Sequence, residues 1–227
     1  YLASQPDLNW RNPEVKDAMF DTLRFWLDRG VDGFRMDVVH FIMKDPELRS
    51  NPLLEEPAPG PKPLGPYDLQ DHVHDKGHPD IHQLFREMRA LFDSYDGDRF
   101  SIGEIHEFDW QRWASFYGDN DELHMPFNFA LIYGDWTAAW ARSIVEAQEA
   151  AIPPGAWPKY VIGNHDEPRI ATRLGPQRAR MATMMLLTLR GTPTLYYGDE
   201  LGMVEVPIPP ALQQDPWGLQ QPGYSRD

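Results

Sequence analysis

Segments with helical spacing of apolar residues alternate along this chain with short strand-like apolar runs. The helical patterns cover residues 13–30, 80–95, 109–118, 135–151 and 176–191, and the strand patterns cover 31–37, 97–104, 122–131, 159–169 and 192–200. Parallel strands need a crossover connection, which is usually a helix. The alternation therefore predicts an α/β fold with parallel strands, either an open doubly wound sheet or part of a (β/α)8 barrel.

Polar residues stand where the predicted strands end. Asp37 and Glu104 close two strands, and Asn164–His165–Asp166 closes a third. None of these strands is followed by a glycine-rich loop of the kind that binds dinucleotides or phosphates. A barrel assembles its active site from the carboxyl ends of several strands, so these residues favour the barrel over the open sheet.

The segment "DGFRMDVVH", residues 32–40, places two opposite charges on one face of a strand, Arg35 and Asp37. Buried charges are costly unless they are paired. This segment alone fits a structural ion pair and also fits an active-site carboxylate that an arginine keeps ionised.

Carboxylates at three strand ends can perform glycoside hydrolysis. A retaining glycosidase uses one carboxylate as nucleophile and another as acid/base, about 5–5.5 Å apart, and the two must differ in pKa. Asp37 beside Arg35 suits the ionised nucleophile, and the less polar setting of Glu104 after "FSIG" is expected to raise the pKa of that carboxyl. Asp166 and its neighbour His165 could stabilise or bind a sugar. Chemistry alone does not single out sugars as the substrate.

Composition narrows the partners. The 227 residues carry a formal net charge of -14, which argues against nucleic acid, and no apolar run approaches the length of a membrane span. There is no cysteine, which suits a reducing compartment, and we expect a cytoplasmic protein. The oligomeric state cannot be predicted from the sequence.

Residues 51–79 are predicted to form a loop-rich insertion after the Asp37 strand, because 51–66 is dense in proline. His72, His74 and His78 lie in this insertion, but their spacing fits no zinc template. We read them as a solvated loop and predict no metal or cofactor in this chain.

Three segments in order resemble the signature segments of the α-amylase superfamily, glycoside hydrolase family 13. They are "GFRMDVVH", "IGEIHEF" and "GNHDEPR". The flanking "QPDLNWRNPEV" and "TPTLYYGDELGM" resemble the α-glucosidase and oligo-1,6-glucosidase members, and the resemblance covers essentially the whole chain.

The resemblance implies a role for each matching residue. It makes Asp37 the nucleophile, Glu104 the general acid/base and Asp166 the transition-state-stabilising aspartate. Arg35 would orient the nucleophile, and His165 would contact the bound glucose. Arg169 would lie near the site entrance, and His40 and Glu107 could line the acceptor side.

The implied function is a retaining hydrolase that cleaves terminal α-glucosidic bonds of short oligosaccharides or disaccharides. The alternatives are a trehalose synthase-like transglycosylase or isomerase of the same family, and a non-catalytic relative of the transporter heavy-subunit type. Family members carry an earlier signature segment that has no counterpart here. We therefore expect residues 1–227 to form the C-terminal part of a barrel, about strands 4 to 8, with negligible activity alone. The calcium sites of the family lie largely in segments that this chain lacks, so calcium is a possibility for a longer parent protein only.

Overall fold

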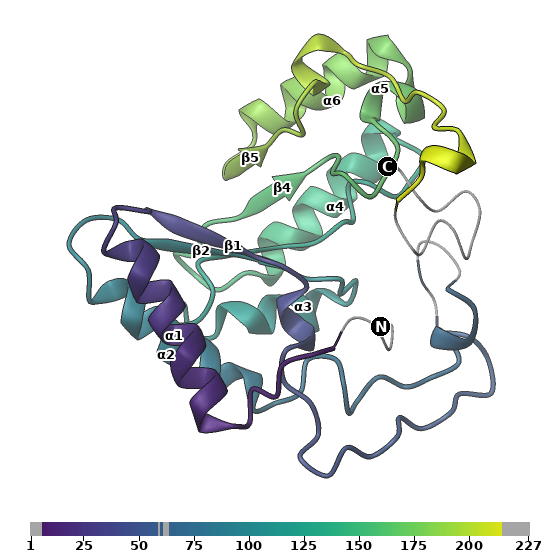
Figure 1. Ribbon diagram of the computed structural model, residues 1–227. Coiled ribbons are helices and arrows are strands. Elements are labelled where there is room, and N and C mark those ends of the chain that lie inside the picture. Colours follow the sequence, from purple (N-terminus) through teal and green to yellow (C-terminus); the bar gives the residue numbers. More distant parts are fainter. Residues whose placement is uncertain (1–5, 59, 61–63, 215–227) are drawn as a thin grey trace. The chain divides into compact units, whose positions relative to one another are not determined.

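A computed structural model of the chain describes residues 6–58, 60 and 64–214 (Figure 1). It divides into two compact units. The first comprises Tyr1–Asn128 and Gln148–Trp157, and the second comprises Phe129–Ala147 and Pro158–Asp227. We describe each unit by itself.

Helix α1 spans Pro13–Leu27 and begins where the sequence predicts. The Asn12 side chain caps it by accepting a hydrogen bond from the Glu14 backbone N–H at 3.1 Å, and Pro13 takes the first helical position. The helix ends three residues before Gly30, whose φ of +87° suits the turn into the next strand.

The first unit contains a parallel sheet in the order β1–β2–β3. The strands are β1 (Gly33–Met36), β2 (Phe100–Glu104) and β3 (Met125–Phe127). Met36 pairs with Gly103, and Glu104 pairs with Phe127. Because the strands run in the same direction, Asp37 and Glu104 reach the same edge of the sheet.

Helix α2 (Ile81–Asp93) and the short helix α3 (Trp110–Ala114) complete the layers of this unit. In Figure 1, α1 and α2 lie on the same side of strands β1 and β2. Their buried side chains share one apolar core, which includes Phe20, Leu27, Phe85, Phe92, Trp113 and Tyr117. Ile152 and Ala156, from the second stretch of the unit, also belong to this core.

The insertion at 51–79 is irregular in its described part. It contains the 3-10 turn η2 (Gly65–Tyr67) and an isolated antiparallel bridge between Leu53 and Gln70. Residues 59 and 61–63, which belong to the predicted insertion, lie outside the described residues. Two further 3-10 turns occur in this unit, η1 (Val39–Phe41) and η3 (Ser115–Tyr117).

The second unit pairs strand β4 (Lys159–Val161) with strand β5 (Thr192–Thr194) in parallel. Its helices are α5 (Ile170–Leu174), α6 (Pro176–Thr188) and the first part of α4 (Ala138–Ala151), followed by the 3-10 turns η4 (Asp199–Leu201) and η5 (Pro210–Leu212). Their core is a cluster around Tyr160, Ile162, Ile170 and Leu186. The sequence did not predict α5.

The alternation of helices with parallel strands confirms the α/β class. None of the helices in the described part of the chain combines the length and the apolar character that a membrane span requires.

Candidate active site

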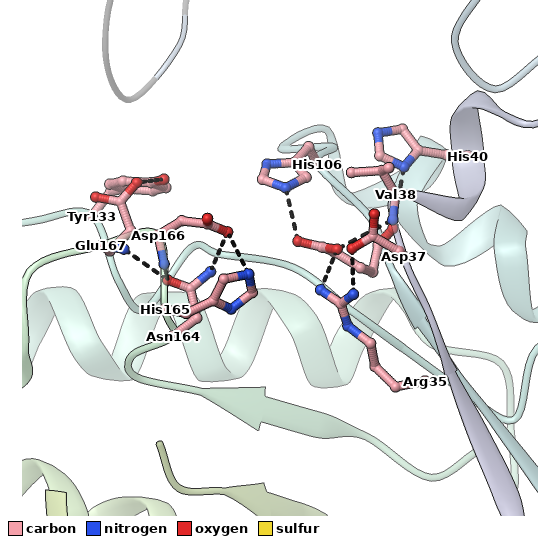
Figure 2. A network of polar contacts seen from close by, with 11 residues as sticks. Arg35, Asp37, Val38, His40, His106, Tyr133, Asn164, His165, Asp166 and Glu167 are labelled. Atoms are coloured by element: carbon pink, nitrogen blue, oxygen red, sulfur yellow. Dashed lines mark hydrogen bonds and ion pairs between the residues drawn. The ribbon is translucent and has the colours of Figure 1, made fainter. Parts of the chain in front are cut away.

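Arg35 joins two carboxylates at the carboxyl edge of the first sheet. Its Nη2 donates to Glu104 Oε2 at 2.5 Å, and its Nη1 donates to Asp37 Oδ1 (Figure 2). The Glu104 side chain is only 3% exposed, whereas Asp37 is largely exposed. The two terminal nitrogens of one guanidinium therefore hold two carboxylates next to each other, which is the pairing of charge that a buried carboxylate requires.

Val38, directly after Asp37, adopts the left-handed region with φ +34° and ψ +42°. This conformation is costly for a β-branched residue, and such outliers cluster at functional sites. Here it has a visible effect, because the Val38 backbone N–H donates to Glu104 Oε2 at 3.1 Å. The strained turn therefore ties the end of β1 to the end of β2.

Opposing effects set the pKa of the Glu104 carboxyl. Burial raises the pKa of its carboxyl, but the hydrogen bond from His106, the Val38 N–H and the charges of His106 and Arg35 outweigh burial and lower the pKa to about 2. His106 Nε2 lies 3.2 Å from Oε1, on the opposite side of the carboxylate from Arg35. Burial therefore acts in the expected direction, but the expectation of a raised pKa for Glu104 is wrong, because the donors around the carboxylate outweigh burial.

His40 is fully buried and contacts the backbone of Glu104. Its Nδ1 lies 3.2 Å from the Glu104 carbonyl oxygen, so Nδ1 carries the proton and donates it. Burial, together with the nearby charges of Lys76 and His106, lowers the pKa of His40 well below its ordinary value, so the ring is neutral. A contact of His40 with an acceptor sugar stays a prediction, because this side chain has no exposed surface here.

Glu107 lies beside His40 in a small polar cavity of about 120 Å³, which His40, Lys76, Gly77, Glu107, Arg112, Ser115 and Phe116 line. Its carboxylate pairs with Lys76 at 3.7 Å and with Arg112 at 3.5 Å, and it accepts the backbone N–H groups of Phe108 and Asp109. These contacts give Glu107 a structural role in shaping the loop after β2. Its contact with an acceptor sugar also remains a prediction.

In the second unit, Asn164 shapes the loop after β4. Its Oδ1 accepts the backbone N–H groups of Asp166 at 3.1 Å and Glu167 at 2.9 Å, and its Nδ2 donates to Asp166 Oδ2 at 3.3 Å. His165 Nε2 stands 3.5 Å from the same Asp166 oxygen (Figure 2). Both His165 and Asp166 are more than half exposed, so the turn presents an imidazole and a carboxylate to solvent.

Two further groups surround this loop within the second unit. The Tyr133 hydroxyl donates to Glu167 Oε1 at 2.6 Å, and burial with the neighbouring carboxylate raises the pKa of Tyr133. Arg169 donates from Nη1 to the Tyr197 carbonyl oxygen at 2.7 Å, and its guanidinium lies over the rings of Tyr196 and Tyr197. Arg169 is thus held against two aromatic rings.

The structure brings Arg35, Asp37 and Glu104 together and places His40 directly behind them. It brings His165 and Asp166 together in the other unit. Sequence reasoning missed His106, whose signal was its place two residues after Glu104 in "GEIHEF", and it missed Tyr133, for which the sequence gives no signal. In the part of the chain that the structure describes, no three His, Cys, Asp or Glu side chains gather closely enough to hold a metal ion.

The protein-family model of the alpha amylase catalytic domain matches residues 1–222 of this chain. The chain belongs to this family. Among other members, a probable alpha-glucosidase of Rhizobium meliloti (strain 1021) is 34% identical over 97% of this chain. The amino acid transporter heavy chain SLC3A1 of Homo sapiens is 33% identical over 89% of the chain.

Solved structures of other α-amylase family proteins have the same fold. The alpha-glucosyl transfer enzyme XgtA superposes on the whole chain with a TM-score of 0.90 at 38% identity. A trehalulose synthase mutant covers 92% of it, with a TM-score of 0.73 at 31% identity. The chain spans 42% of the Rhizobium relative, 30% of the human one and 44% of XgtA.

Proposed function

We propose that this chain carries part of the active site of a retaining glycoside hydrolase that cleaves terminal α-glucosidic bonds of short oligosaccharides or disaccharides. Asp37 is the nucleophile, Glu104 the acid/base and Asp166 the stabiliser of the transition state. Arg35 orients Asp37, His165 contacts the bound glucose, and Arg169 lies at the entrance. The alpha-glucosidase names of the relatives support this substrate class.

The observation that carries the proposal is the shared guanidinium of Arg35. Its two terminal nitrogens bind Asp37 and Glu104 at one sheet edge, and this supports their roles as a nucleophile and an acid/base on two neighbouring strands. In this mechanism an Asp37 oxygen bonds to the anomeric carbon while Glu104 gives a proton to the departing oxygen. Glu104 then takes a proton from water, which releases the sugar with its original configuration.

A transglycosylase is the second candidate function. It is favoured by the structural neighbours that are named as a glucosyl transfer enzyme and as trehalulose and isomaltulose synthases. The chemistry is the same up to the covalent intermediate, and a sugar hydroxyl then replaces water. A non-catalytic role like that of a transporter heavy chain is less well supported, because this chain keeps all three carboxylates.

We further propose that residues 1–227 form the C-terminal part of a (β/α)8 barrel, about strands 4 to 8, with 51–79 as a loop-rich insertion. The superposition on XgtA over the whole chain supports this reading. We also propose a cytoplasmic location, because the sequence contains no cysteine.

The test uses the natural full-length polypeptide that carries this chain. Asp37→Asn should abolish both turnover and covalent labelling by a mechanism-based glucoside. Glu104→Gln should spare labelling by glucosides with good leaving groups, because those leave without a proton. Equal loss of both steps in both variants would contradict the assignment of roles. The ratio of free glucose to transfer products from maltose separates the hydrolase from the transglycosylase.

A further inference from the structure

One half-buried arginine, Arg173, holds both ends of the loop that carries Asp166. It lies in the short helix α5, and its Nε donates to the Pro168 carbonyl oxygen at 2.8 Å. Its Nη2 donates to the carbonyl oxygen of Ile162, the residue that directly follows strand β4. Ile162 and Pro168 flank the loop on either side of Asp166, so a single guanidinium fixes the points where this loop starts and ends.

The third contact of Arg173 reaches a distant segment of the same unit. Its Nη1 donates to the Ile132 carbonyl oxygen at 2.6 Å, across 41 residues of sequence. The next residue, Tyr133, donates its hydroxyl to Glu167 Oε1 at 2.6 Å, so this segment also binds the loop directly. The loop after β4 is therefore anchored to residues 132–133 both through Arg173 and through Glu167.

The chemistry of the guanidinium explains why an arginine stands at this position. It carries five N–H donors in a fixed planar fork, whereas a lysine ammonium is a compact point charge. Buried backbone carbonyls need hydrogen-bond donors, and a side chain with a smaller reach would leave some of these three unpaired. Burial lowers the pKa of Arg173, but an arginine stays charged at any ordinary pH, so the donors stay in place.

The interior of the loop is fixed by different contacts. Asn164 Oδ1 accepts the backbone N–H groups of Asp166 and Glu167, and Asn164 Nδ2 donates to the Asp166 carboxylate. Asn164 therefore sets the direction of that carboxylate relative to the loop, whereas Arg173 sets the place of the loop in the fold. The three contacts of Arg173 are all with backbone carbonyl oxygens, so Arg173 can act on Asp166 only through the loop.

We infer that Arg173 is a positioning residue for Asp166. This inference rests on the proposed function, in which Asp166 stabilises the transition state, and it adds a residue that acts through the backbone. A catalytic group must be held within about 0.5 Å of its productive position, and a misplacement of about 1 Å can cost about 100-fold in rate. The fold meets this demand at an exposed loop by anchoring both of its ends to one guanidinium.

The experiment compares Arg173→Lys with the wild type in the natural full-length polypeptide. The lysine keeps the charge, but it cannot bind all three carbonyl oxygens together. We expect kcat for 4-nitrophenyl α-glucoside to fall by about tenfold to 100-fold. KM should change little, because a carboxylate that stabilises the transition state contributes to kcat rather than to ground-state binding. Arg173→Gln, whose neutral amide keeps a donor, repeats each measurement and should give a loss of kcat of the same kind.

Arg11→Lys is the matched control. Arg11 is a half-buried arginine of the first unit that also joins distant segments: its Nε donates to the Lys44 carbonyl oxygen at 2.7 Å, and its Nη1 pairs with Asp80 at 2.8 Å. It lies outside the proposed site. Both lysine variants should lose stability in urea denaturation, but only Arg173→Lys should lose kcat. An equal loss of kcat in Arg11→Lys would mean that general loosening of the fold is the cause, and would overturn the inference.

A double-mutant cycle tests whether Arg173 acts through Asp166. Calorimetry measures the binding of 1-deoxynojirimycin, an amine with the hydroxyl pattern of glucose, and so needs no turnover. Asp166→Asn and Arg173→Lys should each weaken binding, and the double variant should bind about as weakly as Asp166→Asn alone. If Arg173→Lys weakens binding in the Asp166→Asn background as much as it does in the wild type, the two residues act independently and the inference is refuted.

Two outcomes separate this inference from the proposed function. If Asp166→Asn lowers kcat while Arg173→Lys and Arg173→Gln keep the wild-type kcat, the role of Arg173 is refuted and that of Asp166 stands. If Asp166→Asn itself keeps the wild-type kcat, the proposed role of Asp166 fails, and the inference fails with it.

Discussion

Because the backbone of Val38 is left-handed, we expect the substitution Val38→Gly to have an unusually small effect on the free energy of unfolding. A side chain with a Cβ costs about 1–2 kcal/mol in this region, and glycine removes that cost. Against this, glycine loses about 0.5–1 kcal/mol through the freedom of the unfolded chain. The half-buried side chain loses about 1 kcal/mol of burial, roughly half of the value for a fully buried valine. The terms nearly cancel, so Val38→Gly should change the free energy of unfolding by less than about 1 kcal/mol.

The next residue supplies the comparison. Val39 is 2% exposed and lies in the 3-10 turn η1, where glycine relieves no strain. Val39→Gly loses about 1.5–3 kcal/mol of burial and adds a cavity and the glycine entropy, for a total of about 3–4 kcal/mol. The loss of unfolding free energy on substitution by glycine should therefore be about 3 kcal/mol larger at Val39 than at Val38.

Urea denaturation followed by tryptophan fluorescence measures both values under the same conditions. In the natural full-length polypeptide, Val38→Gly should also keep the wild-type activity, because the N–H that binds Glu104 stays in place. A loss for Val38→Gly as large as that for Val39→Gly would refute the strained turn. It would also remove the explanation for the contact between the Val38 N–H and Glu104.

Three further predictions concern pH, packing and stereochemistry. The pKa of Glu104 is about 2 in the folded protein, below its ordinary value of 4.5. The ionised carboxylate therefore stabilises the fold above pH 4.5, and this contribution is lost as the pH falls toward 2. In urea titrations between pH 6 and 2, the free energy of unfolding of the wild type should fall by about 3 kcal/mol relative to that of Glu104→Gln. Gly33→Ala places a Cβ 2.5 Å from the Phe100 carbonyl oxygen and should lower the free energy of unfolding by about 3 kcal/mol. Gly30→Ala meets no atom within 4 Å and should lower it by about 1 kcal/mol, through its positive φ. An equal loss of stability in thermal unfolding of the two variants would contradict the close approach of β1 and β2. NMR of the first product from an aryl α-glucoside should show α-glucose, and initial β-glucose would remove Asp37 from the nucleophile role.

The sequence alone is enough to predict the features of the fold that depend on neighbouring residues. The start of α1 follows from Asn12 and Pro13, and the end of β2 at Glu104 follows from the change from apolar to polar residues. The pairing of Arg35 with Asp37 was also predictable, because residues two apart in a strand share a face. That Arg35 also binds Glu104 depends on the register of β1 against β2, which no local pattern reveals.

The remaining features depend on contacts between distant segments. The net pKa shift of Glu104 was predicted in the wrong direction, because the apolar residues before it in the sequence do not reveal that Val38 and His106 donate hydrogen bonds to it. His40 is buried just after the left-handed turn at Val38, a conformation that the sequence does not predict because valine is an unexpected residue there. Short α5 has too few residues for a periodic pattern to stand out.

The first unit is discontinuous in sequence, and this sets an order for its folding during synthesis. Ile152 and Ala156 belong to the same core as Phe20 and Trp113, so that core is incomplete until residue 157 has been made. By then the ribosome has already produced residues 129–147 of the second unit. Since domains fold as units while the chain emerges, the first unit should fold only after residue 157 has been made. At that point residues 129–147 of the second unit are already synthesised but not yet folded. A protease cut between 129 and 147 should therefore damage both units, and no simple truncation should yield either one as an independently folding piece.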